Sequence, residues 1–271
     1  MKKESFVIGQ KQCVIYHDDK PEYILLQPVN DHEMENLDRQ VSLIKAEVSE
    51  SFMFVAFLVE RWNQELSPWN APPVFGQESF GEGAGETLRF ISEKLIPLTT
   101  EQYASGSNLP VILGGYSLAG LFALWSAGQT EEFSAVAAVS PSVWFPGWSD
   151  YAQEHKLKTE RIYLSLGRKE EKTRNKIMAA VGDCIREQHK RLVEDGIVSV
   201  LEWNEGNHFQ KSDLRCAKGF VWCVRNMDPA VSCVYNRYGY IGRNGRSSES
   251  KCQETEQGDG RPECDDVCRA C

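Results

Sequence analysis

The seven residues from Gly114 to Gly120 constrain the fold of this chain most strongly. They read Gly-Gly-Tyr-Ser-Leu-Ala-Gly and lie between an apolar stretch typical of a strand and one typical of a helix. A strand, a tight turn that carries a serine and then a helix form the arrangement of a nucleophile elbow. The residues two before and two after the serine must be small so that strand and helix can approach, and Gly115 and Ala119 meet this need. We therefore expect Ser117 to be held in a strained turn at the edge of a sheet.

Length and composition indicate one large α/β domain. The 271 residues are 41% hydrophobic, which is enough for a substantial core. Thirty basic against thirty-nine acidic side chains give a net charge of -9. A phosphate backbone is bound by a positively charged surface, so we expect no nucleic-acid partner.

Apolar runs alternate with helix-like segments through the middle and later chain. This alternation predicts a mostly parallel central sheet with helices on both faces, and the short links between the first strands predict an antiparallel hairpin at that edge. No stretch is long enough to insert a large lid, so we expect one α/β domain over residues 1–227. The expected strands are 13–16, 23–26, 52–59, 111–113, 135–139, 162–166 and 198–203, and the expected helices are 33–50, 84–99, 118–127, 171–195 and 213–225.

Residues 228–271 differ in character from the rest of the chain. They are rich in Gly, Arg, Ser, Glu and Cys without an apolar period, so we expect an irregular or disordered tail. Three of its cysteines, Cys264, Cys268 and Cys271, could supply thiolates to a metal, but the tail has no histidine and the spacing fits no standard pair of knuckles. We therefore expect neither a metal nor a cofactor. The four cysteines outside the tail, at positions 13, 184, 216 and 223, match no paired-ligand motif and are expected to be reduced thiols.

No apolar run of signal-peptide length follows Lys2 and Lys3. The longest apolar run, residues 52–59, has only the length of a strand. These features predict a cytoplasmic protein without a membrane partner. The sequence is compatible with a homo-oligomer.

The order of catalytic residues in α/β hydrolases selects one histidine. Serine, acid and histidine follow one another along the chain, each at the carboxyl end of a strand. His17 and His32 precede Ser117, whereas His155 and His189 lie in charged segments typical of solvated helix faces. His208 follows the expected strand 198–203 in a short polar loop, so we predict that it is the general base.

The acid should follow the preceding strand, which ends in Gly167. Glu170 lies three residues after that glycine, where a carboxylate can reach the histidine and hold its tautomer. Glu171 is the nearest rival, but acids also favour the first turn of a helix for electrostatic reasons alone. We predict Glu170 as the acid, with Glu171 or a serine–histidine dyad as the alternatives.

Two backbone amides should stabilise the oxyanion. One is the amide after the nucleophile, at Leu118, and the other should come from the loop after the buried strand 52–59, where Arg61 and Trp62 are the candidates. Aromatic residues gather near the motifs, and pockets are mostly apolar, so we expect a substrate-binding set. It comprises Trp69, Tyr116 and Trp144.

With these pieces placed, the chain resembles an esterase family of α/β hydrolases that includes enterochelin-esterase-like and esterase-D-like enzymes. The resemblance covers roughly residues 4–226 and is carried by the stretches 61–69, 95–97, 114–120, 140–144 and 206–209. It implies Ser117 as nucleophile, His208 as base and a carboxylate after Leu166 as acid. Some members of the family resemble this layout but work as Ser-His dyads.

These features predict a serine hydrolase that cleaves a small-molecule carboxylic ester through an acyl-enzyme without a cofactor. A small acyl ester, a catecholate siderophore lactone and a carbohydrate-linked ester are all compatible with the sequence. The main alternative is a non-catalytic binding or scaffold protein that retains the fold.

Overall fold

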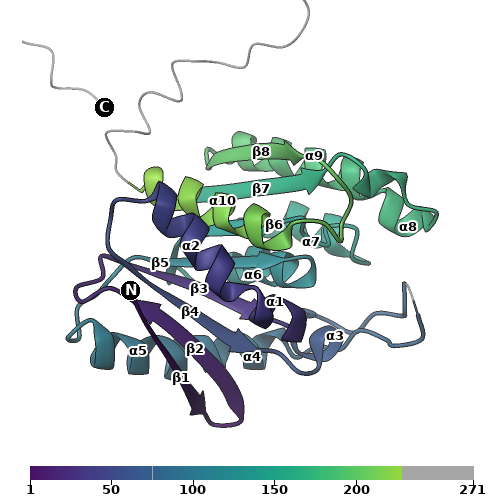
Figure 1. Cartoon of the computed structure of the whole chain (residues 1–271). Coiled ribbons are helices and arrows are strands. Elements are labelled where there is room, and N and C mark those ends of the chain that lie inside the picture. The colour runs from purple at the N-terminus through teal and green to yellow at the C-terminus, as the bar shows by residue number, and fades with distance from the viewer. Residues whose placement is uncertain (75, 228–271) are drawn as a thin grey trace, which may run out of the picture.

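One eight-stranded sheet organises the chain, with the strand order β1-β2-β4-β3-β5-β6-β7-β8 (Figure 1). The computed structural model describes residues 1–74 and 76–227, so the predicted cysteine-rich tail lies outside the described residues. The strands are β1 (Lys2–Ile8), β2 (Lys11–His17), β3 (Tyr23–Val29), β4 (Phe52–Leu58), β5 (Val111–Tyr116), β6 (Phe133–Val139), β7 (Arg161–Gly167) and β8 (Val198–Asn204).

Ten α-helices accompany the sheet within the described residues: α1 (Asp31–Glu35), α2 (Leu37–Glu47), α3 (Trp62–Glu65), α4 (Ala84–Phe90), α5 (Ile96–Tyr103), α6 (Leu118–Gln129), α7 (Trp148–Glu154), α8 (Lys176–Ala179), α9 (Val181–Glu194) and α10 (Ser212–Arg225). A π-helical segment, Ile91–Leu95, joins α4 to α5, and a 3₁₀ turn spans Glu170–Lys172. The single sheet with its helices confirms the predicted α/β class.

The sheet is parallel from β4 through β8 and antiparallel at its beginning. β1 pairs with β2 and β2 pairs with β4 in antiparallel fashion, whereas β3 lies between β4 and β5 and is parallel to both. An antiparallel hairpin lies at this edge, but it joins β2 to β1 and not to the next predicted strand; the sequence did not indicate β1 because most of its side chains are exposed. β2 and β3, which adjoin in the chain, do not pair.

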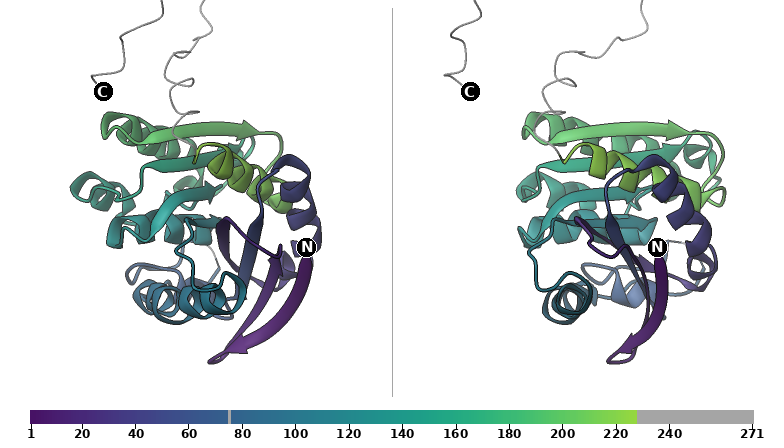
Figure 2. Two further views of the ribbon diagram at one scale, coloured as in Figure 1. Left: turned by 90° about the vertical axis from the view of Figure 1, so that its left-hand side faces the viewer. Right: turned by 60° about the vertical axis from the view of Figure 1, so that its left-hand side comes forward.

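Helices cover the two faces of the sheet over separate cores. α2 and α10 pack on one face, where Val41, Ile44 and Phe220 are buried against the strands. α4, α5, α6, α7 and α9 lie over the other face, where Leu121, Phe122 and Ile185 are buried. Figure 2 shows the two sets of helices on opposite sides of the sheet. Because both faces are covered, the central strands are apolar along their whole length, as β4 and β5 are.

Three predicted helices are interrupted rather than continuous. The segment 33–50 divides at Asn36 into α1 and α2, and Asn30 caps α1 through a reciprocal capping box with Glu33. The segment 84–99 extends to Tyr103 but passes through a π-helical turn just before Pro97, which lacks an amide hydrogen. Only the later part of the segment 171–195 is the long helix α9. Its beginning is replaced by the 3₁₀ turn and by α8.

The four described cysteines form no disulfide among themselves. Cys13, Cys216 and Cys223 are buried, whereas Cys184 is half-buried. Within the described part of the chain, no helix combines the length and the apolar character that a membrane crossing needs.

Glu33 on α1 carries a buried carboxyl group. Its side chain accepts a hydrogen bond from the Asn30 amide, and only 8% of the residue is exposed. Burial raises the pKa of the Glu33 carboxyl to about 8, against an ordinary value of 4.5. The folded state therefore binds a proton that the unfolded state releases between these two pH values.

We predict that this carboxyl makes the wild-type chain less stable as pH rises from about 4.5 to about 8. Glu33→Gln removes that component and can still cap Asn30. Relative to wild type, it should gain at least about 1.4 kcal/mol in the free energy of unfolding between about pH 5 and pH 8, measured by urea denaturation. The exposed Glu35→Gln on the same helix is the control. A difference between Glu33→Gln and wild type that does not change with pH would contradict the prediction.

Candidate active site

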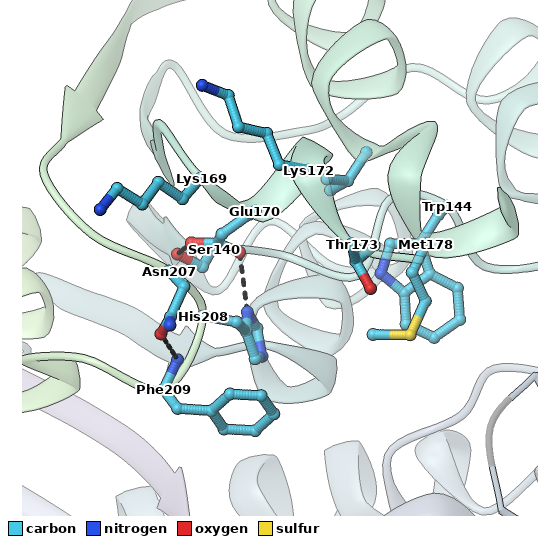
Figure 3. Close-up of a pocket in the computed structure, with 11 residues that line it drawn as sticks. Ser140, Trp144, Lys169, Glu170, Lys172, Thr173, Met178, Asn207, His208 and Phe209 are labelled. Carbon is cyan, nitrogen blue, oxygen red and sulfur yellow. Dashed lines mark hydrogen bonds and ion pairs between the residues drawn. The ribbon is translucent and has the colours of Figure 1, made fainter. Parts of the chain in front are cut away.

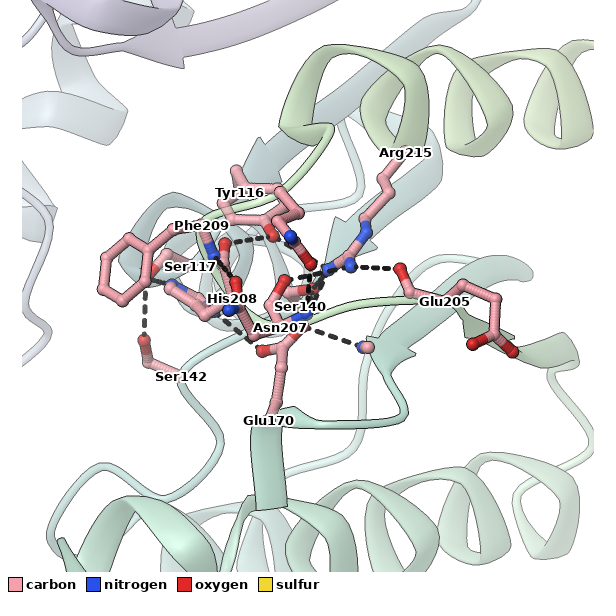
Figure 4. A network of polar contacts seen from close by, with 12 residues as sticks. Tyr116, Ser117, Ser140, Ser142, Glu170, Glu205, Asn207, His208, Phe209 and Arg215 are labelled. Carbon is pink, nitrogen blue, oxygen red and sulfur yellow. Dashed lines mark hydrogen bonds and ion pairs between the residues drawn. The ribbon is translucent and has the colours of Figure 1, made fainter. Parts of the chain in front are cut away.

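Four neighbouring parallel strands end at one edge of the sheet, and each is followed closely by a polar residue of one cluster. Ser117 follows β5, Ser140 follows β6, Glu170 lies three residues after β7, and His208 lies four residues after β8. Because parallel strands present their carboxyl ends at the same edge, residues that are 91 positions apart meet there. Figure 4 shows the resulting network of polar contacts.

Ser117 occupies the strained turn that the sequence predicts. Its φ is 59° and its ψ is -120°, a backbone conformation that residues other than glycine rarely adopt. A Cβ atom on Gly115 would collide with the backbone of Ala119, which explains why both positions flanking the serine are small. The turn leaves the Ser117 hydroxyl half-buried at the start of α6, where its Oγ lies 3.4 Å from Ser142 Oγ.

His208 lies between Ser117 and Glu170. Its Nε2 is 3.0 Å from Ser117 Oγ, and its Nδ1 is 2.7 Å from Glu170 Oε2. The Tyr116 hydroxyl donates a hydrogen bond of 2.7 Å to the His208 carbonyl and fixes the loop behind the ring. This is the geometry in which a histidine accepts a proton from a serine while a carboxylate holds its orientation.

Glu170 is the buried member of the cluster. Its Oε1 accepts hydrogen bonds from the Gly167 amide at 2.7 Å and from the Ser140 hydroxyl at 2.8 Å. Burial alone raises the pKa of Glu170, but the hydrogen bond and charge of His208, together with the donors from Ser140 and Gly167, hold it below its usual value. The carboxylate is therefore ionised at neutral pH and faces the imidazole as an anion.

Glu171, the alternative acid, points elsewhere. Its carboxylate pairs with Arg186 at 3.1 Å, and that residue also binds Asp183 on α9. Of the two carboxylates that the sequence left as candidates, Glu170 is the one that contacts His208.

Arg215 is the residue of this cluster that the sequence analysis missed. It lies on α10 and is 1% exposed, and one of its guanidinium nitrogens binds Glu170 Oε1 at 2.8 Å and Tyr116 Oη at 3.0 Å. Its other terminal nitrogen donates to the carbonyls of Glu205 and Asn207 at 2.9 and 3.0 Å. Arg215 thus neutralises the buried carboxylate and ties down the loop that carries His208. Its position beside Cys216 and Ala217, on the apolar face of α10, is the signal that could have revealed it.

Gly167 makes room for this arrangement. A Cβ atom there would come within 2.7 Å of the Gly206 carbonyl and within 2.9 Å of Arg215. The glycine is needed for close approach of the β7 and β8 loops.

The residues predicted to stabilise the oxyanion differ in whether their backbone amides already donate a hydrogen bond. Leu118 is the first residue of α6, a position whose amide has no partner within the helix. Trp62 begins α3 in the same way, but the Arg61 amide donates to Glu65 Oε1 at 3.1 Å. β3 also lies between β4 and β5, so the loop after β3, in which Asp31 begins α1, is nearer in the sheet to Ser117 than the loop of Trp62.

The three predicted substrate-binding aromatics occupy different environments. Trp144 lines the pocket beside His208. Trp69 donates to the Pro146 carbonyl at 2.8 Å and packs on Phe145, and it does not line this pocket. Tyr116 is buried and does not line it either; its hydroxyl supports the loop of His208.

A pocket of about 440 Å³ opens at His208 and Glu170 (Figure 3). Phe209, which is 91% exposed, stands at its mouth, and Trp144 and Met178 lie at one side. Phe209 was not among the residues predicted from the sequence. The lining residues are Ser140, Trp144, Lys169, Glu170, Lys172, Thr173, Met178, Val181, Asn207, His208 and Phe209.

Residues 1–74 and 76–227 contain no group of three or more His, Cys, Asp or Glu side chains that could hold a metal ion. The three cysteines considered as metal ligands, Cys264, Cys268 and Cys271, lie outside the described residues.

Comparison with known proteins identifies a family and several similar folds. A family model described as "Putative esterase" matches residues 41–208. The structure is similar to the siderophore hydrolase EstA from Aspergillus nidulans (17% identity, TM-score 0.66, covering 84% of this chain and 94% of that one). It is also similar to an IroE-like serine hydrolase from Shewanella oneidensis (17% identity, TM-score 0.67, 82% and 79% covered). A third similar structure is the enterobactin esterase FES from Shigella flexneri (15% identity, TM-score 0.58, 84% and 60% covered). A comparison with curated protein sequences found no match.

The sheet topology and these neighbours define an α/β hydrolase fold. Since the family model covers more than half of the chain, this protein belongs to that esterase family.

We predict that Arg215→Met lowers the free energy of unfolding by about 3–5 kcal/mol, because it leaves the Glu170 carboxylate buried without its countercharge. Arg89→Met breaks an exposed ion pair with Glu86 of 2.9 Å and should cost less than about 1 kcal/mol. Urea denaturation at neutral pH compares the two variants. Similar losses in both would show that the buried pair has no special weight.

Proposed function

We propose that this esterase is a serine hydrolase that cleaves carboxylic esters through an acyl-enzyme on Ser117. The observation that carries the proposal is the contact series from Ser117 Oγ through both nitrogens of His208 to Glu170, at 3.0 and 2.7 Å. Each step of acyl transfer requires a nucleophile, a base within hydrogen-bond reach and a group that orients the base.

In the first half of the reaction, His208 Nε2 takes the proton of Ser117 as its Oγ attacks the ester carbonyl. The imidazolium that forms faces the ionised Glu170, which stabilises it without taking its proton. His208 then donates the proton to the leaving alcohol as the tetrahedral intermediate collapses to the acyl-enzyme. In the second half, His208 deprotonates a water that attacks the acyl carbonyl, and the acid is released with Ser117 restored.

The oxyanion of each tetrahedral intermediate needs donors in place before the charge develops. We assign the first to the Leu118 amide, which follows the nucleophile. We assign the second to a helix-initial amide in one of the two neighbouring loops, at Trp62 or at Asp31. Both positions leave an amide without a partner inside its own helix.

The substrate we propose is a small-molecule ester, because His208, whose Nε2 lies 3.0 Å from Ser117 Oγ, lines a pocket of about 440 Å³. The structural neighbours whose titles name siderophore or enterobactin hydrolysis support including siderophore esters among the compounds to test.

Ser117→Ala should lower kcat for an activated aryl ester by at least about 10³, because it removes the nucleophile. His208→Ala should have a similar effect, and the double variant should be within about tenfold of either single variant since the residues act as a unit. The measurement is steady-state hydrolysis of 4-nitrophenyl acetate, with circular dichroism to verify folding. Turnover close to wild type in Ser117→Ala would contradict the proposed mechanism.

The acid can be tested separately. Glu170→Gln should reduce kcat by at least about tenfold, a modest part of the roughly 10⁴ that a triad carboxylate can contribute, whereas Glu171→Gln should change it by less than about threefold. The two variants are matched in charge and adjacent in the chain. The reverse order would assign the acid to Glu171, and two nearly neutral results would indicate a dyad of Ser117 and His208.

A further inference from the structure

Unpaired positive charges gather around the proposed active site. In the described part of the chain, the exposed lysines and arginines with no carboxylate within 4.0 Å are Lys20, Lys94, Lys158, Lys169, Lys172, Arg174, Lys176 and Lys211. Four of these lie within the eight-residue stretch 169–176, and Lys211 lies three residues after His208. This clustering occurs on a chain whose net charge is -9.

Neighbouring carboxylates are already engaged. Glu170 is buried between His208 and Arg215, Glu171 pairs with Arg186 at 3.1 Å, and Glu205 pairs with Arg168 at 3.2 Å. The positive charge of the stretch 169–176 is therefore not compensated by the acids beside it.

Two of these lysines line the pocket itself. Lys169 and Lys172 border the same 440 Å³ space as His208, and both are exposed (Figure 3). The remainder of the lining includes the apolar side chains of Trp144, Met178 and Val181. The pocket thus combines an apolar surface with two lysines at its border, which form no ion pair with a described carboxylate and whose ammonium ends extend outward, away from Trp144 and Met178, in Figure 3.

We propose that the ester cleaved at Ser117 carries an ionised carboxylate in addition to the ester group, and that Lys169 and Lys172 bind this carboxylate at the rim of the pocket. The inference rests on the proposed function. A hydrocarbon part of the substrate packs on Trp144 and Met178. The local positive potential raises the concentration of such an anion at the site, although the protein as a whole is acidic.

The test compares matched anionic and neutral esters. For charge on the alcohol side the pair is 4-acetoxybenzoate and 4-acetoxybenzamide, and for charge on the acyl side it is monoethyl adipate and ethyl hexanoate. The quantity measured is the ratio of kcat/KM for the anionic ester to kcat/KM for its neutral partner. Intrinsic differences in reactivity cancel when this ratio is compared between protein variants.

In Lys169→Gln/Lys172→Gln, the ratio should fall at least about fivefold for one pair, mainly through KM. The matched control is Lys20→Gln/Lys94→Gln, which removes the same net charge from two other exposed, unpaired lysines. Lys20 precedes β3, at the edge of the sheet opposite to Ser117. The control should keep the wild-type ratio, and the wild-type ratio should also decrease as salt is added.

Two outcomes would overturn the inference: an unchanged ratio in the lysine variant, or an equal fall of the ratio in the control. An unchanged ratio excludes charge recognition by these lysines, whether both esters keep their rates or lose them equally, and an equal fall in the control assigns the effect to net charge. If the neutral esters are hydrolysed in a Ser117-dependent way while the ratio does not respond, only this inference fails. If Ser117→Ala retains hydrolysis, the proposed function fails and the inference with it.

Discussion

The arrangement at the carboxyl edge of the sheet depends on one buried ion pair, between Glu170 and Arg215 at 2.8 Å. A buried carboxylate is costly unless charge and hydrogen bonds compensate it. Arg215 provides the charge, and Ser140 and Gly167 provide further donors. The hydrogen bond and charge of His208, with the donors from Ser140 and Gly167, hold the pKa of Glu170 below its usual value despite burial, so an anion faces the imidazole.

The same pair joins the parts of the fold that carry the reacting groups. Arg215 comes from α10 and contacts Tyr116 at the end of β5, Glu170 after β7 and the carbonyls of the loop after β8. Ser117 is positioned independently by the strained turn between β5 and α6. The serine thus belongs to a rigid strand–helix junction, and the histidine belongs to a loop held in place by an electrostatic cluster.

Much of this could be predicted from the sequence. Small residues around Ser117, the order of serine, acid and histidine, and the spacing of Glu170 from Gly167 are local features, and the structure brings all three side chains together. Arg215 was missed because a charged residue on an amphipathic helix is usually exposed. Proximity to a motif in sequence selected Trp69, whose ring contacts Phe145 and whose Nε1 donates to the Pro146 carbonyl, so its role in substrate binding stays a prediction. β1 was missed because an edge strand with exposed side chains has no clear apolar pattern.

Reaction of the native protein with a fluorophosphonate, followed by peptide mass spectrometry, tests the central claim most directly. Ser142 is the informative internal control. Its Oγ lies only 3.4 Å from that of Ser117, but Ser142 does not share the positive φ that Ser117 has. The account predicts one phosphonyl group per chain, on Ser117, and slow or no labelling in His208→Ala. Labelling of Ser142 in place of Ser117, or no labelling of folded wild-type protein, would contradict it.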